Sequence, residues 1–296
     1  MSVKTRIPDK APGLPDPHRK KSTEMSRIQP HPVKKKSIQE RIDRVKNAPQ
    51  YAQRSPEWYE VRRGLMTASV VSAALGMKPF ASFTGDVRRD AIENAVHRKF
   101  KGNIATRHGV KYEDSVREKF DAIMGKTTKE YGLLIHRDIH GPKRGLDWLA
   151  ASPDGMTEDG ELLEIKCPYK REIKPGYVPP YYLAQIQAQL EVCDLDLCYY
   201  CEWQPDWISQ SGKEIINIVP VERDHTWLER HYDELYSFYT DLMEERRTFV
   251  PPPPPTCLVR DDLYDDDPYD ASAKRHKPLF VEDTTHESTP LFIHDD

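Results

Sequence analysis

Residues 152–168 read Ser-Pro-Asp-Gly-Met-Thr-Glu-Asp-Gly-Glu-Leu-Leu-Glu-Ile-Lys-Cys-Pro. A Pro-Asp-Gly turn is followed by a second turn signal, Glu-Asp-Gly, and then by an apolar run, which together predict a hairpin. Because side chains alternate faces along a strand, Leu163 and Ile165 share one face. Glu164 and Lys166 share the other. This stretch decides the fold, since it makes one strand apolar on one side and charged on the other.

The charged side of this strand carries the chemistry. Asp154, on the strand before it, lies ten residues upstream of Glu164. Two carboxylates can hold a divalent cation, and Lys166 would lie near a water molecule bound to it. The alternative is the solvent-facing side of an edge strand, where Glu-x-Lys is common. The spacing to Asp154, and the motifs described below, favour a metal-dependent site.

Composition and charge limit the possible domain organisation of the chain. The chain has 296 residues, 25 of them proline, with 38% hydrophobic and 31% charged residues, which predicts one or two domains with disordered ends. Residues 1–50 hold 13 Lys and Arg against 5 Asp and Glu, a net charge of +8. Residues 261–296 hold 3 against 11, a net charge of −8. The net charge of −4 for the whole chain does not by itself indicate a nucleic-acid binder.

Targeting signals are weak. No apolar run approaches the roughly 18 residues that span a bilayer, and the first residues lack the apolar core of a signal peptide. Five cysteines without a secretion signal indicate a reducing, intracellular compartment. The basic runs Arg19–Lys21 and Lys34–Lys36 fit nuclear import or a DNA tether, and equally a solvated tail. A nuclear or viral replication compartment is therefore the expectation.

The predicted domain organisation is simple. Residues 1–36 form a basic disordered tail, residues 37–250 a single folded domain, and residues 251–296 a Pro-rich acidic disordered tail. Five strands are predicted, at Tyr131–His136, Asp147–Ala151, Leu162–Cys167, Leu197–Trp203 and Ile215–Val221. Helices before, between and after them give a mixed α/β layer.

Helix signals surround the strands. Ser37 opens a capping box, and Ser55-Pro56 opens a second helix. Thr84 and Asp224 are the expected caps of two later helices. Two apolar faces are expected, one with Tyr112, Val116, Phe120 and Ile123 and one with Trp227, Leu228, Tyr232, Leu235, Phe238, Tyr239 and Leu242.

Three further polar groups are candidates for the site. Glu113 lies at the border of an apolar helix face, from which its carboxylate could reach Asp154 and Glu164; a lone helical Glu is usually just solvated. Arg62 lies seven residues before Ser69, which is expected at a helix start. A helix N-terminus, a hydroxyl and an arginine can bind a phosphate. An ordinary cap and a surface arginine explain the last two residues equally well.

The motifs together resemble a known family. They are Trp58-x3-Arg62-x-Gly-x2-Thr-Ala-Ser69, Gly109-x2-Tyr-Glu113, Ser152-Pro-Asp154-Gly, Leu-Glu164-Ile-Lys166-Cys-Pro and Tyr-Leu-Ala-Gln185-Ile-Gln187. In this order they resemble the YqaJ-type viral recombinases, relatives of phage lambda exonuclease within the PD-(D/E)xK nuclease superfamily. The resemblance covers roughly residues 54–250 and leaves out both tails.

The resemblance implies a fold and an activity. The fold would be a restriction-endonuclease-like core, with a central mixed five-stranded sheet flanked by helices. The activity would be a Mg²⁺-dependent 5′-to-3′ exonuclease on double-stranded DNA, with Mn²⁺ as a substitute ion, that leaves 3′ single strands for recombination or repair. It also implies a homotrimer around the DNA and a single-strand annealing partner.

The family implies a role for each residue. Asp154, Glu164 and the Ile165 carbonyl would bind the metal, with Glu113 binding directly or through water. Lys166 would orient or deprotonate the attacking water, or stabilise developing charge, and Gln185 would position the water or Lys166. A terminal 5′-phosphate would be held by three residues that match the motifs, Arg62, Ser69 and Ser152.

Other readings remain at this stage. An endonuclease would use the same site, and an inert DNA-end-binding module would keep the fold; the intact set of site residues argues against the second. Cys198-x2-Cys201 resembles half a zinc knuckle, but it lies in a strand pattern without a second pair, so buried core cysteines are favoured. The five cysteines do not bracket the core, which excludes the iron–sulfur cluster of some relatives.

Overall fold

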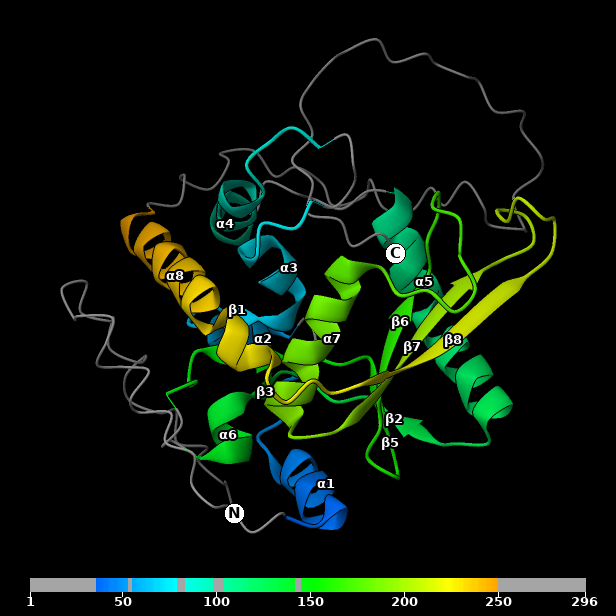
Figure 1. The fold of residues 1–296 in the computed structure, drawn as a ribbon, viewed down its shortest axis with the longest axis horizontal. Helices are drawn as coiled ribbons and strands as arrows, with labels where there is room; N and C mark the ends of the chain where they lie inside the picture. The colour runs from blue at the N-terminus through cyan, green and yellow to red at the C-terminus, as the bar shows by residue number, and fades with distance from the viewer. Residues whose placement is uncertain (1–35, 53–54, 79–82, 98–103, 142–144, 250–296) are drawn as a thin grey trace.

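The computed structural model describes residues 36–52, 55–78, 83–97, 104–141 and 145–249 (Figure 1). The predicted acidic tail and all but the last residue of the predicted basic tail lie outside the described residues, as does Cys257. The described residues contain the whole stretch from Ser152 to Pro168. They form a mixed α/β structure with two sheets, which confirms the predicted fold class.

The larger sheet has five strands in the order β2-β5-β6-β7-β8. The strands are β2 (Thr128–Lys129), β5 (Gly155–Thr157), β6 (Leu162–Lys166), β7 (Leu197–Gln204) and β8 (Ile215–Glu222). Only β6 and β7 pair in parallel, and the other pairs are antiparallel. The sheet is therefore mixed, as predicted. Strand β6 lies in its centre, which rules out the edge-strand alternative for Glu-x-Lys.

A smaller sheet has the order β1-β4-β3, from β1 (Met66–Thr67), β4 (Leu149–Ala151) and β3 (Leu134–Ile135). The prediction that 131–136 and 147–151 belong to the main sheet is wrong, since these segments form β3 and β4. Their places are taken by β2 and β5, which were not predicted as separate strands. Such short strands have little pattern of their own, and their partners far along the chain decide where they pair.

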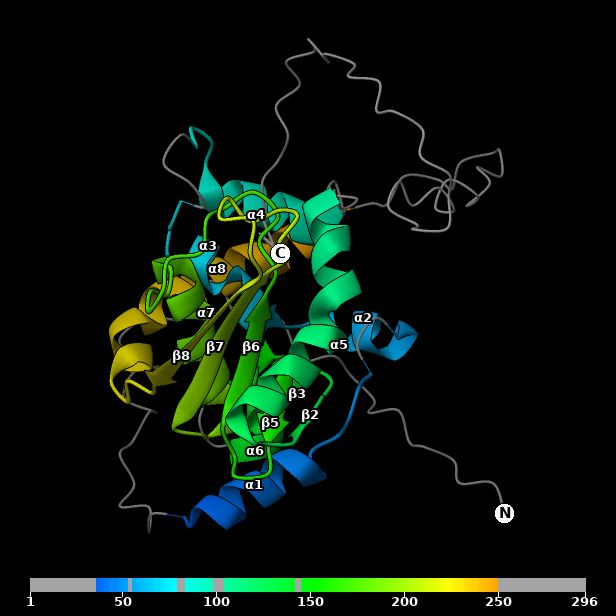
Figure 2. The same ribbon diagram turned by 90° about the vertical axis from the view of Figure 1, so that its right-hand side faces the viewer.

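Helices cover both faces of the larger sheet (Figures 1 and 2). Helix α5 (Ile104–Met124) lies on one face, where Val116 and Phe120 pack with Leu163 and Ile165 in one apolar cluster. Helix α7 (Pro180–Cys193) lies on the other and connects β6 to β7, as a crossover between parallel strands requires. The alternation along β6 thus separates an apolar face toward α5 from a charged face toward α7.

Helix α7 is buried on almost all sides. It contacts β4 of the smaller sheet, α3 (Val71–Ala74), the short 3₁₀ segment η3 (Ala68–Val70), α6 (His136–His140) and α8 (Trp227–Thr248). Burying one large apolar side chain contributes roughly 1.5–3 kcal/mol, so this helix is a main source of stability. It also places its polar side chains inside the protein, where each needs a partner.

The helix starts follow the caps only in part. Ser37 forms the expected capping box of α1 (Ile38–Asn47), and Ser55 caps α2 (Pro56–Arg62). The expected cap Thr84 is wrong: α4 (Val87–His97) begins after Asp86, whose side chain accepts from the Arg89 amide. Thr226, and not Asp224, directly precedes α8. A side chain caps a helix only where the backbone turns, and tertiary packing sets that point.

The predicted apolar faces need one correction. All seven residues predicted for α8 are buried. On α5, Val116 and Phe120 are buried, whereas Ile123 is 57% exposed and Met124 packs against the cluster in its place. The apolar face of α5 therefore ends with Met124 and not with Ile123.

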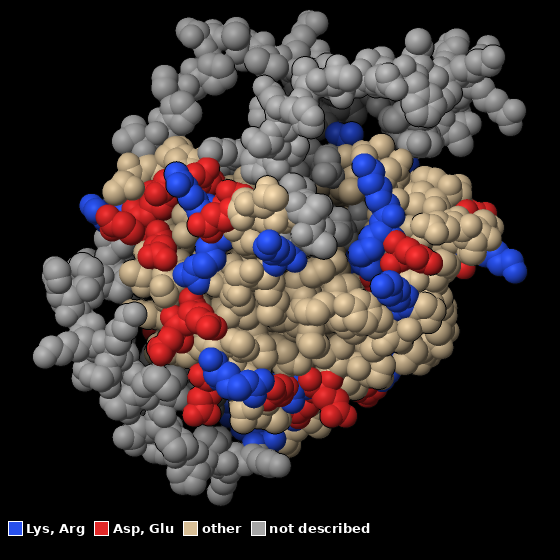
Figure 3. Space-filling model, turned by 45° about the horizontal axis from the view of Figure 1, so that its top comes forward, with Lys and Arg blue, Asp and Glu red and all other residues tan. Residues whose placement is uncertain are grey.

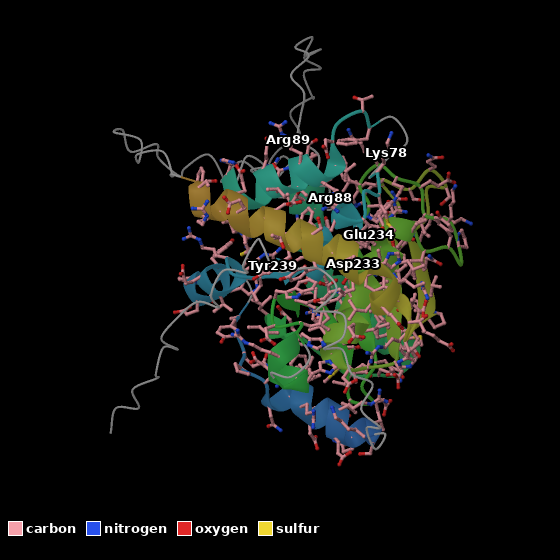
Figure 4. The ribbon with its side chains drawn as sticks, turned by 60° about the vertical axis from the view of Figure 1, so that its left-hand side comes forward. Lys78, Arg88, Arg89, Asp233, Glu234 and Tyr239 are labelled. Carbon is pink, nitrogen blue, oxygen red and sulfur yellow. The ribbon has the colours of Figure 1, made fainter. Side chains whose placement is uncertain are left out.

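Helices α4 and α8 pack together on the outside of the smaller sheet (Figures 1 and 4). Arg88 of α4 reaches toward α8: its guanidinium lies 3.6 Å from Asp241 and 5.4 Å from the centre of the Phe238 ring. Figure 4 labels Arg88 and Arg89 on α4 and Asp233, Glu234 and Tyr239 on α8. This pair of helices supports the end of the fold away from α1.

Helix α1 closes the opposite end against the hairpin between β5 and β6. Gly160 in that turn has a φ of +83°, and an added Cβ would lie 2.6 Å from Cγ1 of Ile42. A glycine is required there both by the left-handed backbone and by the close approach. The Glu-Asp-Gly signal therefore marks a turn that also seats α1.

The surface in Figure 3 carries no broad field of one charge. Lys and Arg side chains (blue) alternate with Asp and Glu side chains (red) around an area with few charges. Among the described helices, none is both long and apolar enough to cross a membrane.

Candidate active site

The centre of the site is the charged face of β6. The side chains of Glu164 and Lys166 are 1% and 5% exposed, and Lys166 Nζ lies 2.8 Å from Glu164 Oε1. Helix α7 supplies two amides: Gln185 Nε2 donates to Glu164 Oε1 at 2.6 Å, and Gln189 Nε2 donates to Oε2 at 2.6 Å. Because both oxygens of Glu164 are held, its carboxylate has one orientation.

Asp154 lies at the start of β5, next to this carboxylate. Its Oδ2 accepts a hydrogen bond of 2.7 Å from the Ile165 amide, so the antiparallel pairing of β5 and β6 positions it. Burial raises the pKa of Asp154 well above its usual range, and the charges of Glu164 and Glu113 raise it further. Lys166 opposes the shift but does not cancel it. The cluster therefore holds more negative charge than its own lysine neutralises.

Glu113 joins the site from the other side of the sheet. It lies on α5, whose apolar face packs against β6, and its side chain is 25% exposed. Its side chain lines the same cleft as Asp154 and Glu164. Three carboxylates thus converge from α5, β5 and β6. The expected reach of Glu113 toward Asp154 and Glu164 agrees with this placement.

A second, cationic part of the site is built by α2 and the turn after it. Arg62 Nη2 donates to Ser69 Oγ at 3.2 Å, and its guanidinium lies 4.5 Å from the centre of the Trp58 ring. Burial lowers the pKa of Arg62 to about 10. Among the described residues no carboxylate pairs with Arg62. A buried guanidinium in this state attracts an anion.

Ser152 lies between the two parts of the site. Its Oγ is buried and has no hydrogen-bond partner among the described residues. A buried hydroxyl in this state costs free energy unless a ligand or water satisfies it. This observation fits a phosphate oxygen at the place where Arg62 and Ser69 meet the carboxylates.

Ser69 departs from its expected position. It lies within the 3₁₀ segment η3 and not at the start of an α-helix. The following helix, α3, has four residues, so an anion would gain little from a helix dipole. The cationic part depends on Arg62 and on the hydroxyls of Ser69 and Ser152.

One cleft contains all of these groups. Its volume is about 280 Å³, and its lining includes each of the nine candidates: Arg62, Ser69, Glu113, Ser152, Asp154, Glu164, Ile165, Lys166 and Gln185. The residues come from five places in the chain. The carboxylates of Glu113, Asp154 and Glu164 offer oxygen ligands to this part of the cleft, which suits a hard cation such as Mg²⁺.

The chain is similar to known proteins in the region that contains the cleft. Residues 57–196 match the model of the YqaJ-like viral recombinase domain. Over these residues the chain is similar to the YqaJ-like viral recombinases. The match confirms the resemblance that the ordered motifs predict, and it covers every candidate site residue.

Two further proteins are similar to this chain, one in sequence and one in structure. The uncharacterized protein R354 of Acanthamoeba polyphaga mimivirus is 31% identical over 183 residues, and the match covers 56% of this chain. It covers 32% of that protein, so the chain spans about a third of the length of this relative.

The second relative is LHK-Exo, an alkaline exonuclease from Laribacter hongkongensis. Its crystal structure with dAMP has a TM-score of 0.50 and 26% identity, over 65% of this chain and 95% of that chain. Another crystal structure of the same protein has a TM-score of 0.49. The family match and this similarity together support a nuclease.

The sequence motifs did not predict two residues that contact the site, Gln189 and Arg117. Gln189 lies one helical turn after Gln185, and the i, i+4 spacing places both amides on Glu164. That spacing is visible in the sequence. Arg117 donates from Nε to the Asp154 carbonyl at 3.0 Å and lies 3.5 Å from Glu113 Oε1. Its role depends on how α5 packs, and no sequence signal points to it.

Among the described residues, Cys198 and Cys201 do not form a metal site. Cys198 packs in the apolar cluster on the α7 side of the sheet, and Cys201 packs in the cluster on the α5 side. Three residues apart on a strand, the two thiols face opposite ways. Burial raises the pKa of Cys201 to about 12, which disfavours the thiolate form that binds metal. The half zinc knuckle is therefore a core packing feature.

Proposed function

We propose that the protein is a Mg²⁺-dependent exonuclease that degrades one strand of double-stranded DNA from a 5′-phosphorylated end and leaves 3′ single strands. One observation carries the proposal. A single cleft is lined at one part by three carboxylates and a lysine, and at another by an arginine without a carboxylate partner and two serines. An exonuclease needs both parts, one for the scissile phosphate and one for the terminal phosphate.

The carboxylate part suits phosphodiester hydrolysis. A divalent cation on Asp154, Glu164 and the Ile165 carbonyl would neutralise a phosphate oxygen and lower the pKa of a bound water. Glu113 adds a carboxylate oxygen directly or through water. Burial and the neighbouring carboxylates raise the pKa of Asp154, and such a cation would offset the negative charge of those carboxylates.

The protein groups then divide the remaining work. Gln185 and Gln189 hold the Glu164 carboxylate in a fixed orientation. The Lys166 ammonium lies beside that carboxylate, where it can orient the attacking water and stabilise the charge that develops on the phosphate. Buried positioning of this kind lowers the barrier because no group has to reorganise during the reaction.

The cationic part sets the end preference. Arg62 can donate two parallel hydrogen bonds to a terminal phosphate, and Ser69 and Ser152 can donate one each. A DNA end without the phosphate would leave Arg62 and the Ser152 hydroxyl unsatisfied. Similarity to LHK-Exo, which was crystallised with the nucleoside monophosphate dAMP, supports a product of that class.

The partners remain predictions. A homotrimer around the DNA, an annealing protein and a nuclear or viral replication compartment follow from the family resemblance and from the basic N-terminal residues. Recombination or repair would use the 3′ strand.

The decisive experiment is digestion of a linear duplex labelled at either end, with and without a 5′-phosphate, in Mg²⁺, in Mn²⁺ or in chelator. We expect release of nucleotides from phosphorylated 5′ ends, and no release in chelator. Cutting of closed circular DNA without preference for ends would favour an endonuclease. No cutting with either metal would favour an inert DNA-end-binding module.

Arg62→Ala tests the phosphate part separately. Loss of hydrogen bonds to a charged phosphate costs about 1.5–3 kcal/mol each, so the preference for phosphorylated ends should fall roughly 10- to 100-fold. The matched control is Arg63→Ala, since Arg63 is the next residue, is 67% exposed and pairs only with Glu60 at 3.8 Å. An equal loss of preference in both variants would contradict the assignment.

A further inference from the structure

A second polar cluster lies where α6 packs on the last turns of α7 (Figure 1). It consists of His136 and His140, the two ends of α6, and Glu191 of α7. None of these three residues lines the nuclease cleft. The side chain of His136 is completely buried, and that of Glu191 is 11% exposed. The cluster is thus separate from the site described above and is built into the interior.

The two imidazole rings are stacked on each other. Their centres are 3.9 Å apart and their planes differ by 10°. His136 Nε2 lies 3.4 Å from Glu191 Oε1, and His140 Nε2 lies 2.9 Å from the Glu191 carbonyl oxygen. One ring nitrogen from each histidine and a carboxylate oxygen of Glu191 all lie within 4.8 Å of one another.

Each ring also has an unsatisfied nitrogen. The Nδ1 atoms of His136 and His140 are buried and have no hydrogen-bond partner in the part of the chain that the structure describes. A neutral imidazole has one N–H donor and one lone pair, and a buried polar atom without a partner costs roughly 1–3 kcal/mol. Two such atoms in one cluster indicate that protein groups alone do not complete it.

The charges around the cluster leave room for a cation. Arg223 donates to Glu191 Oε2 and pairs with Asp194, which also lies 3.2 Å from Lys36 Nζ. The other carboxylate oxygen, Oε1, faces His136. His140 Nε2 donates to the Glu191 carbonyl oxygen, which leaves the lone pair of this ring on Nδ1, the atom without a partner among the described residues.

We propose that His136, His140 and Glu191 form a structural zinc site that joins α6 to α7. Imidazole nitrogens and a carboxylate oxygen are ligands that Zn²⁺ prefers, and two histidines four residues apart lie on one side of a helix turn. Zn–N bonds of about 2.0–2.1 Å require ligand atoms roughly 3.3 Å apart. The rings would have to turn out of their stacked arrangement to point one nitrogen each at the ion, and a water would complete the tetrahedron.

The zinc site would act through the fold. Strand β3 ends at Ile135, immediately before His136, so the ion would connect the smaller sheet to α7. Helix α7 also carries Gln185 and Gln189, which hold Glu164. The ion would therefore stabilise the helix on which the nuclease site depends without contacting the substrate. The proposal does not depend on the proposed nuclease function.

The test uses the full chain, stripped with chelator and then titrated with Zn²⁺ alone by calorimetry and by thermal unfolding. Two variants separate the sites: His140→Gln removes a ligand of the proposed site, and Glu164→Gln removes a ligand of the nuclease site. We expect Glu164→Gln to bind one Zn²⁺ that His140→Gln does not bind. At a hundredfold excess over Kd the midpoint of unfolding should rise by roughly 5–10 °C in the wild type and in Glu164→Gln only.

Co²⁺ gives a second readout on the wild-type protein, in case His140→Gln does not fold. A tetrahedral site with two imidazoles gives intense visible absorption, whereas a six-coordinate site of carboxylates and water gives weak absorption. Intense bands in Glu164→Gln support the proposal. Weak bands in the wild type, or equal Zn²⁺ uptake by the wild type and a folded His140→Gln, would overturn it.

Discussion

Helix α7 contacts two buried polar clusters, one at its middle and one at its last turn. The first cluster has more carboxylates than cations, whereas the second has imidazole nitrogens that lack hydrogen-bond partners among the described residues. In the middle, Glu164 lies beside Asp154 with Lys166 as the nearby cation, and burial together with the neighbouring carboxylates raises the pKa of Asp154. At the last turn, Arg223 and His136 lower the pKa of Glu191 well below its usual range despite its burial. There the carboxylate is paired, and the unsatisfied atoms are the Nδ1 nitrogens of His136 and His140.

This difference shows what each cluster lacks. A surplus of carboxylate charge requires a hard cation with oxygen ligands, which is the chemistry of Mg²⁺. Unpartnered imidazole lone pairs require a softer ion such as Zn²⁺. The same helix therefore supports a candidate catalytic site and a candidate structural site, and the two can be disturbed independently.

The largest expected effect is on the carboxylate cluster. Lys166→Ala or Glu164→Gln should lower the rate of duplex digestion by about 10²–10⁴-fold, because each removes a group that we propose acts at the scissile phosphate. The rate is measured from nucleotide release under single-turnover conditions. Lys46→Ala, an exposed lysine on α1, is the control and should retain the wild-type rate. Normal activity of Lys166→Ala would contradict the proposal that the carboxylate cluster at the middle of α7 is the catalytic site.

A smaller effect separates two neighbouring glutamines of α7. Gln189 donates to Glu164, whereas Gln187 donates to the Glu222 carbonyl and accepts from the Asp224 amide. Gln189→Ala should lower the digestion rate roughly 10- to 100-fold, since a hydrogen bond to a charged group contributes about 1.5–3 kcal/mol. Gln187→Ala should leave the rate unchanged and lower the free energy of unfolding by about 1–2 kcal/mol. The reverse pattern would show that the two faces of α7 are misassigned.

The smallest effect is the dependence of stability on pH in chelator. The folded pKa of Asp154 is raised, so its contribution is complete below the unfolded pKa and is lost as pH rises through the folded pKa. The slope approaches about 1.4 kcal/mol per pH unit in that window. Asp154→Asn should remove this loss, as should added Mg²⁺.

The other cluster has the opposite sign. The folded pKa values of His140 and Glu191 are lowered, so their stability is present at higher pH. For His140 it is lost as pH falls from the unfolded value near 6.5 toward about 3. Urea unfolding of His140→Gln and Asp154→Asn at a series of pH values measures both the loss of stability at low pH and the loss at high pH. Identical pH profiles for the two variants would contradict the contrast between the clusters.

Much of the site is visible in the sequence because local rules decide it. Alternation along β6 separates Glu164 and Lys166 from Leu163 and Ile165 whatever the partner strands are. The Pro-Asp-Gly turn delivers Asp154 to the paired strand, and the helical spacing of Gln185 and Gln189 follows from 3.6 residues per turn. The caps Ser37 and Ser55 are local in the same sense.

Other features depend on distant pairings and could not be predicted. The strands at 131–136 and 147–151 read like members of the main sheet, but their partners place them in a second sheet. Arg117 reaches Asp154 only because α5 packs across β6. His136 and Glu191 are 55 residues apart, and no pattern in either segment predicts their contact.

By itself, the sequence determined which residues share a face, which turns are tight and which motifs stand in which order. Those properties follow from the backbone geometry of a few consecutive residues. Only the tertiary structure decided which of the buried charges are paired and which are left in excess. That balance depends on distances between segments far apart in the chain, where burial makes each missing partner costly.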